Sequence, residues 1–148
     1  TLALRARKVA QGPIEISLEV KDGKVTGQMS MGGQARPVNA DIGGELFADG
    51  AGAHFAVATL PLAGGYKTSF RNLNIQTLKA KTLQLDVVGS EQVTVPAGTF
   101  DAWKVELNSP DDGAKATIWI VKDSRTVARV VAVSPQMGGA TVTTELQK

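Results

Sequence analysis

The chain has 148 residues, of which 16 are basic, 14 are acidic and none is cysteine. This length favours a single domain whose core needs no disulfide or metal, and the near balance of charge does not favour a nucleic-acid partner. The absence of cysteine excludes thiol catalysis, disulfides and cysteine-ligated metal sites. No apolar run reaches the roughly 18 residues that a membrane-spanning helix needs.

The N-terminal third alternates apolar and polar residues, the pattern of half-buried antiparallel strands. The segments at 14–20 and 24–31 follow this pattern. Between them, Asp22 and Gly23 both tolerate a positive φ and predict a tight hairpin turn. Pro37 has no backbone N–H, so the strand that contains it is predicted to lie at a sheet edge or to carry a bulge.

Residues 43–65 are rich in glycine and alanine and show no regular alternation. Within them, residues 52–60 predict a short helix. Asp49 is placed to cap the start of this helix, and Pro61 is placed to stop it.

Strand patterns return at Tyr66 and continue to the end of the chain, giving about ten strands and one short helix in all. Dense hairpin turns leave little room for crossover helices, so the sequence predicts a mainly β, antiparallel fold. A sheet of this size curls, and we expect a β-barrel or half-barrel formed by one domain over residues 1–148. Because Thr1 and Lys148 both lie in strand patterns, we expect a processed chain or a domain cut from a longer exported protein.

The most patterned stretch is VTVPAGTFDAW, residues 93–103. Pro96 fits poorly in a paired strand, and Gly98 allows a backbone conformation that other residues avoid. The stretch therefore predicts a β-corner that sets the strand register, not a catalytic loop. Phe100 and Trp103 have opposite parity, so both can enter one interior only if a bulge intervenes.

Catalytic patterns are weak in this chain. His54 is the only histidine, and no nucleophile-elbow sequence accompanies it. A hydrolase that uses His54 or a carboxylate pair is kept as a hypothesis. The strand carboxylates that such a pair would use are Glu19, Asp86, Asp101 and Glu106. Most of them occupy the polar phase of their strands, as solvated side chains do, so we expect no enzyme activity.

Cofactor and metal motifs are also lacking in the sequence. The segment SPDDGA at 109–114 lacks the spacing and terminal glutamate of a calcium loop, and a hairpin turn is the better interpretation. The glycine-rich segments do not make a nucleotide-binding fingerprint. The short basic clusters have no interleaved aromatic residues, which oligonucleotide-binding sheets use for stacking. We therefore expect no cofactor, no metal and no nucleic-acid partner.

Large apolar side chains are candidates for the interior of the barrel. Aromatic residues make up only 5% of the chain, and the strands carry many small residues, which fill a wide interior poorly. The alternative is that the large residues simply fill the core. The residues expected to line a ligand cavity are Tyr66, Phe70, Trp103, Trp119, Met29 and Met31.

The segments at 88–107, 118–130 and 137–146 together resemble a family of uncharacterised exported bacterial proteins. That family has a Val-Pro-Ala-Gly-Thr-Phe hairpin, and Pro96, Gly98, Phe100 and Trp119 match its pattern. The resemblance implies an antiparallel barrel or half-barrel in the cell envelope, periplasm or secreted fraction. The implied fold is broadly similar to that of the lipoprotein carriers LolA and LolB. The family has no established catalytic residue, so the resemblance assigns none to this chain.

Two functions follow from these observations. The first is a non-catalytic envelope or secreted module that binds a small apolar or lipid-like ligand in its interior. The alternative is a structural or interaction module, the C-terminal domain of a larger secreted enzyme such as a peptidase, with a solid interior and a covalently linked neighbouring domain. Neither function requires a transmembrane segment.

Overall fold

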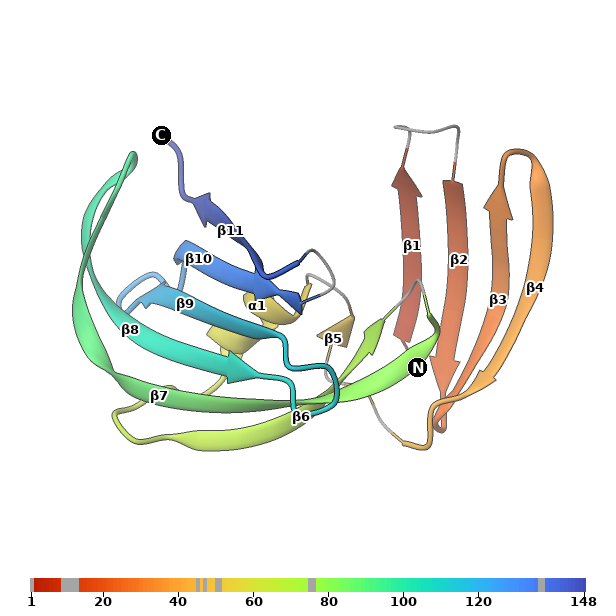
Figure 1. Ribbon diagram of the computed structural model, residues 1–148, viewed down its shortest axis with the longest axis horizontal. Coiled ribbons are helices and arrows are strands. Elements are labelled where there is room, and N and C mark those ends of the chain that lie inside the picture. Colours follow the sequence, from red (N-terminus) through yellow and green to blue (C-terminus); the bar gives the residue numbers. More distant parts are fainter. Residues whose placement is uncertain are drawn as a thin grey trace. The chain divides into compact units, whose positions relative to one another are not determined.

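The computed structural model describes residues 2–8, 14–44, 46, 48–49, 52–74, 77–135 and 138–148. The chain divides into two compact units. One comprises Thr1–Leu46 with Asn74–Ala80, and the other comprises Phe47–Leu73 with Lys81–Lys148. Each unit is built around its own sheet, and Figure 1 shows the two sheets in red to orange and in yellow to blue.

The first unit contains a four-stranded antiparallel sheet with strand order β1-β2-β3-β4. Its strands are β1 (Leu2–Lys8), β2 (Ile14–Lys21), β3 (Lys24–Met31) and β4 (Gln34–Asp41). The β2–β3 turn has the predicted form, with φ of 49° at Asp22 and 75° at Gly23. Pro37 lies on β4, the edge strand, as its missing N–H predicts.

The second unit contains a seven-stranded sheet with strand order β11-β10-β9-β8-β7-β6-β5. Its strands are β5 (Ala48–Asp49), β6 (Lys67–Asn74), β7 (Lys79–Val95), β8 (Gly98–Asn108), β9 (Lys115–Val121), β10 (Val127–Ser134) and β11 (Ala140–Glu145). Pairing is antiparallel from β7 to β11, whereas β5 pairs with β6 in parallel.

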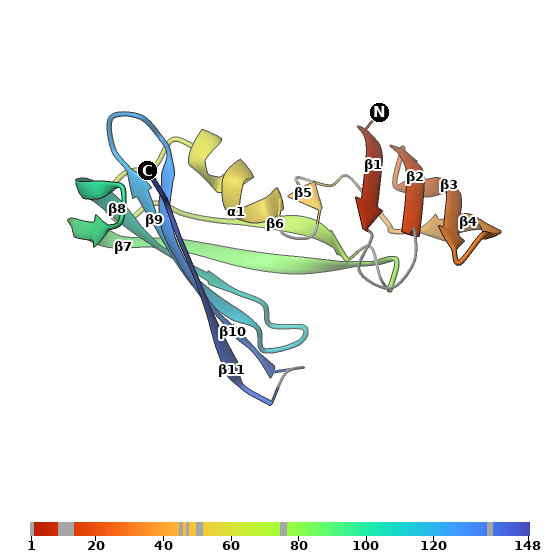
Figure 2. The same ribbon diagram turned by 90° about the horizontal axis from the view of Figure 1, so that it is seen from above.

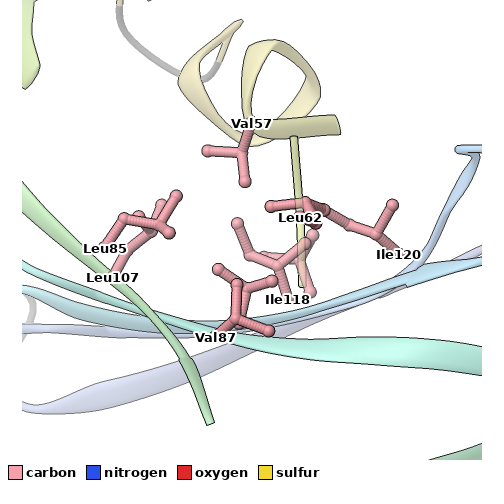
Figure 3. Packing of buried hydrophobic residues seen from close by; sticks show 9 residues of the cluster. Val57, Leu62, Leu85, Val87, Leu107, Ile118 and Ile120 are labelled. Atoms are coloured by element: carbon pink, nitrogen blue, oxygen red, sulfur yellow. The ribbon is translucent and has the colours of Figure 1, made fainter. Parts of the chain in front are cut away.

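A short helical segment lies against one face of the seven-stranded sheet. It consists of α1 (Gly52–Ala56) and a 3₁₀ turn, η1 (Val57–Thr59), and Figure 2 shows it on one side of the strands. Val57 is fully buried and points from this segment toward the sheet (Figure 3). Arg125, in the β9–β10 turn, donates from Nη1 to the Leu60 carbonyl at 3.2 Å and so ties the end of η1 to the sheet.

The apolar cluster under this segment is called the first core. Its buried members are Val57, Leu62, Leu85, Val87, Val105, Leu107, Ile118, Ile120 and Val130. The strand residues come from alternate positions of β7, β8 and β9, together with Val130 of β10, as expected for side chains on one face of a sheet. Burial of each such side chain contributes about 1.5–3 kcal/mol, so this face supplies much of the stability of the unit.

A second core forms on the opposite face of the same sheet, near the β7–β8 hairpin. Its buried members are Val93, Val95, Ala102, Val121 and Ala128, with Ala97, Phe100, Trp119 and Leu146 packed against them. The β7–β8 register shifts between Val87 and Gly89. This bulge moves the apolar residues of β7 from one face to the other. The hairpin tip is held at the C-terminal segment, where the Ala97 N–H donates to the Leu146 carbonyl at 3.2 Å.

The fold agrees with the sequence in its main features. The mainly β, antiparallel architecture with one short helix is confirmed, and the described residues contain eleven strands. Strand pairing does not close a barrel within the described residues, so the barrel or half-barrel and the single domain stay predictions. Asp49 is the last residue of β5, and its side chain lies outside the part of the chain that the structure describes, so its capping of α1 (Gly52–Ala56) stays a prediction.

Candidate functional site

A cavity of about 180 Å³ lies in the seven-stranded unit, between α1 and the sheet face of the first core. Residues from α1, β6, β7, β8, β9 and β10 surround it. They are Ala53, His54, Asn72, Lys81, Leu83, Leu107, Ala114, Lys115, Ala116, Ala132 and Val133. Leu107 is also a member of the first core, so the cavity continues the apolar layer beneath the helical segment.

Small side chains explain why this space is not filled. Leu107, Ala116 and Ala132 are register partners on β8, β9 and β10, and partners in register point to the same face of a sheet. The two alanines therefore lie side by side where larger residues would close the gap. Ala53 of α1 is also small and almost completely buried, with 1% of its surface exposed. A cavity of this kind persists because surrounding residues only partly relax into it.

The polar groups at the cavity are basic or neutral. Lys81, Lys115 and His54 are its titratable lining residues, and Asn72 adds a buried amide. The Lys81 ammonium forms an ion pair with Asp112, with 2.9 Å between Nζ and Oδ2. Lys115 is exposed to solvent. The cavity thus combines apolar walls with a polar rim, at which the charge of Lys81 is paired with Asp112.

The loop between β8 and β9 positions this rim. The Thr82 N–H donates to Asp111 Oδ2 at 2.9 Å, which fastens the loop to β7. Asp112 accepts from the Ala114 N–H at 3.1 Å and from Lys81. Ser109, Lys81 and the Ala114 N–H together lower the pKa of Asp112 to about 2. These carboxylates therefore hold the turn predicted for 109–114 in place.

His54 lies at the cavity without the partners of a hydrolase. Burial, and then the charge of Lys81, lower the pKa of its imidazole below the usual value, so the ring is neutral at pH 7. Within the described residues, its imidazole makes no hydrogen bond to a serine or a carboxylate. The same part of the chain has no group of three or more His, Cys, Asp or Glu residues that could hold a metal ion.

The strand carboxylates named as catalytic candidates lie on the surface. Asp86 Oδ2 is 2.6 Å from Lys67 Nζ, and Asp101 Oδ2 is 3.0 Å from Lys122 Nζ. Glu19 is exposed in the four-stranded unit, and the remaining candidate, Glu106, is exposed on β8. The prediction that the chain is not an enzyme remains a prediction.

The residues predicted to bind a ligand fall into three places. Tyr66, Phe70 and Trp103 pack against the first core. Phe70 also packs against Ala53 and Leu83, both of which line the cavity. Phe70 is therefore the predicted residue with the most direct link to the cavity.

The other predicted binding residues lie elsewhere. Trp119 packs against the second core, on the opposite face of the sheet. Met29 and Met31 belong to the four-stranded unit, where they line a separate pocket of about 190 Å³ with Gln34 and Arg36. The structure therefore does not bring the six residues into one site, and their roles in binding stay predictions.

Trp119 lies in a row of charged side chains that crosses the sheet from β7 to β11. Its indole Nε1 donates to Glu91 Oε1 at 2.7 Å, and this bond, with the charge of Lys104, lowers the pKa of Glu91. Lys104 Nζ and Arg129 Cζ lie 5.6 and 5.7 Å from the centroid of the Trp119 ring. Arg129 in turn pairs with Glu145 at 2.8 Å. These contacts within the chain link five strands on this face of the sheet.

Sequence reasoning missed the alanines and lysines of the cavity. Ala116 and Ala132 alternate with larger residues on their strands, but only the pairing register shows that they are neighbours. The sequence pattern of Lys81 is that of a solvated strand residue, because the apolar residues around it come from other elements. The signal that could have revealed the cavity is a small residue at the core-facing position of each of two successive hairpin strands.

These features define a class of protein: a mainly β chain built on antiparallel sheets, with a short helix beside a small apolar cavity. The family described as "Protein of unknown function (DUF3108)" matches residues 8–147, so the chain belongs to this family. No curated protein and no solved structure matches the chain. Among the described residues, no helix is both long and apolar enough to span a membrane.

Proposed function

We propose that the seven-stranded unit is a non-catalytic binding module that takes a small apolar or lipid-like ligand into the cavity beside α1. The observation that carries this proposal is the cavity of about 180 Å³ with Leu83, Leu107 and Ala116 among its walls. An engineered apolar cavity of about 150 Å³ binds benzene, so a space of this volume admits a group of that size. The walls therefore favour an aliphatic or aromatic group of similar size.

The predicted aromatic residues have a supporting role in this proposal. Phe70 packs against Ala53 and Leu83, so its position affects two walls of the cavity. Tyr66 and Trp103 pack against the first core, which continues from the cavity. We expect these residues to shape the cavity, with Phe70 the one most affected by a ligand.

The test is a substitution that fills the cavity. In Ala116→Leu, the added carbons occupy the space that the ligand would enter. Saturation-transfer NMR with 1-hexanol as the probe is expected to show binding to the wild-type protein and to lose it in this variant. Ala35→Leu makes the same chemical change at an exposed position of the four-stranded unit and is expected to bind normally. Equal binding by Ala116→Leu and the wild type would count against the proposal.

A structural or interaction module of a larger secreted enzyme is the second candidate function. It is favoured by the first core, where Val57 and Leu62 fill the space between η1 and the sheet. Under this function, 1-hexanol is expected to show no saturable binding to the wild type. The parent reading frame should also run well beyond Thr1 into a catalytic domain.

The cellular location and the half-barrel shape belong to the same proposal. We propose an extracytoplasmic protein with a half-barrel similar to the lipoprotein carriers LolA and LolB. Support comes from the Pro-Ala-Gly-Thr-Phe resemblance at 96–100 and from the helical segment that covers one face of the sheet. Fractionation of the native cells, with immunodetection of the full-length protein, is expected to place it outside the cytoplasm. Recovery with cytoplasmic markers would contradict this location.

A further inference from the structure

We propose that β11 pairs with β11 of a second copy of this chain, so that two seven-stranded sheets join in a symmetric dimer. This inference does not depend on the proposed ligand site. The structural basis is the place of β11 at the edge of its sheet, where one side of its backbone has no strand neighbour within the described residues (Figure 1). Such an edge presents a row of N–H and C=O groups with which another strand can pair.

The hydrogen bonds around β11 show which of its backbone groups point away from the sheet. The Leu146 N–H donates to a β10 carbonyl at 2.9 Å. In an antiparallel pair, the backbone groups of successive residues point alternately toward the partner strand and away from it. Thr141, Thr143 and Glu145 therefore direct their backbone groups outward. The Gln147 side-chain amide donates to the Glu145 carbonyl at 3.2 Å, as expected for a carbonyl on the open side.

The other edges of the two sheets carry features that hinder strand addition, and β11 carries none of them. Pro37 lies on β4, β5 has only two residues, and β1 has three basic residues among seven. By contrast, β11 has six residues, four of them β-branched, with no proline, no basic residue and an unbroken register to β10. Natural sheets block unwanted pairing with proline, charge or short strands, so the composition of β11 favours pairing with a further strand.

The sequence of β11 is complementary to a second copy of itself. In an antiparallel pair centred on Thr143, this residue lies opposite its own copy, and Thr141 lies opposite Glu145 of the second copy. All three residues with outward groups then meet one another. Threonine pairs stabilise neighbouring strands, and Glu145, the only charge of the strand, does not face another carboxylate. On the opposite face, Val142, now 47% exposed, meets Thr144. This complementarity favours a second copy of the chain as the partner.

The oligomeric state of the full chain in solution is the first measurement. Pairing of one six-residue strand is a small contact beside the roughly 1,200–2,000 Å² of stable interfaces, so a reversible dimer is expected. Sedimentation equilibrium from about 1 μM to about 1 mM covers the dissociation constants of weak complexes. The mass is expected to rise with concentration from 15.5 kDa toward twice that value. A mass that stays at 15.5 kDa throughout would overturn the dimer and leave this edge to a strand of another protein.

Charge substitutions at the centre of the pair test the symmetric arrangement. Thr143→Lys and Thr143→Glu each place two like charges opposite one another, so each variant alone is expected to dimerise up to about fivefold more weakly. An equimolar mixture should recover the affinity, because lysine then faces glutamate. Thr26→Lys makes the same change at an exposed position of β3, which has a neighbour on both sides, and should dimerise as the wild type does.

A proline at the same position tests the backbone pairing. The Thr143 N–H points outward, so Thr143→Pro removes no hydrogen bond to β10 and is expected to remain folded by circular dichroism. Loss of this donor from both copies should weaken the dimer by at least about tenfold. If the wild type dimerises and Thr143→Pro dimerises equally well, the contact does not involve β11. If the lysine and glutamate variants bind each other no more tightly than themselves, the register centred on Thr143 is wrong.

Discussion

Gly98 is the residue in the hairpin motif that leaves least freedom for substitution. It follows the Pro96-Ala97 turn, pairs with Val95 and has a φ of 142°, a conformation that other residues rarely adopt. A Cβ at this position would meet the Phe100 ring at 3.5 Å, an ordinary contact, so the cost comes from the backbone. The residue therefore serves the fold of the hairpin.

A substitution tests this assignment. Gly98→Val is expected to destabilise the protein by about 1–3 kcal/mol, because the backbone must leave its native conformation or remain strained. Thr143→Val is a control at an exposed strand position and should change stability little. The measurement is the free energy of unfolding in urea. An unchanged value for Gly98→Val would show that the hairpin does not need glycine.

Asp112 makes a pH-dependent contribution to stability. Its pKa is lowered from 3.8 to about 2 by Ser109, Lys81 and the Ala114 N–H. A group with a lowered folded-state pKa stabilises the protein above its unfolded pKa, and this contribution is lost as the pH falls through the folded value. The loss is therefore expected between about pH 4 and pH 2.

The variant Asp112→Asn isolates this contribution. It is expected to lose about 1 kcal/mol at pH 7, after allowance for solvent screening at a partly exposed site. Its stability should also fall less than that of the wild type between pH 4 and pH 2. Urea unfolding at several pH values measures both effects. Parallel curves for the two proteins would contradict the role of Asp112.

At the scale of elements, the helical segment is held mainly through its contact with the sheet. The α1 helix has five residues, too few to be stable alone, so packing must supply its stability. Val57 is fully buried in the first core, whereas Phe55 has 68% of its surface exposed. Substitutions at Val57 and Phe55 therefore distinguish stabilisation by packing from stabilisation by the helix propensity of the segment.

Two alanine substitutions test this contrast. Val57→Ala is expected to cost about 2 kcal/mol, because it removes buried methyl groups and leaves a cavity. Phe55→Ala removes a larger side chain, yet it should change stability by less than about 0.5 kcal/mol. Thermal unfolding of both variants gives the comparison. Equal losses would show that the helical segment is not packed as described.

In the β7–β8 hairpin, the sequence predicts which residues alternate but not which core each of them joins. The opposite parity of Phe100 and Trp103 was visible in the sequence, and the structure places them against the second and first cores. A barrel would have a single interior for both of them. The register shift after Val87 gives β7 buried residues on both faces of the sheet, so both aromatic residues are packed without sharing an interior.

At the scale of the whole molecule, alternation predicted the strands well because side chains on a strand point to opposite faces in turn. The two units were not predicted, since alternation says nothing about which strands pair. Met29 and Met31 were grouped with Trp103 for that reason, although they belong to the four-stranded unit. The cavity escaped prediction because Ala116 and Ala132 become neighbours only through strand register.

A protein-observed NMR titration of the methyl groups with 1-hexanol tests whether a ligand binds beside α1. Saturable shifts are expected for Leu83, Leu107 and Val133, which line the cavity. Val25 and Val38 in the four-stranded unit should not shift. Shifts spread evenly over both units, or no saturable shift at the three cavity residues, would contradict a ligand site beside α1.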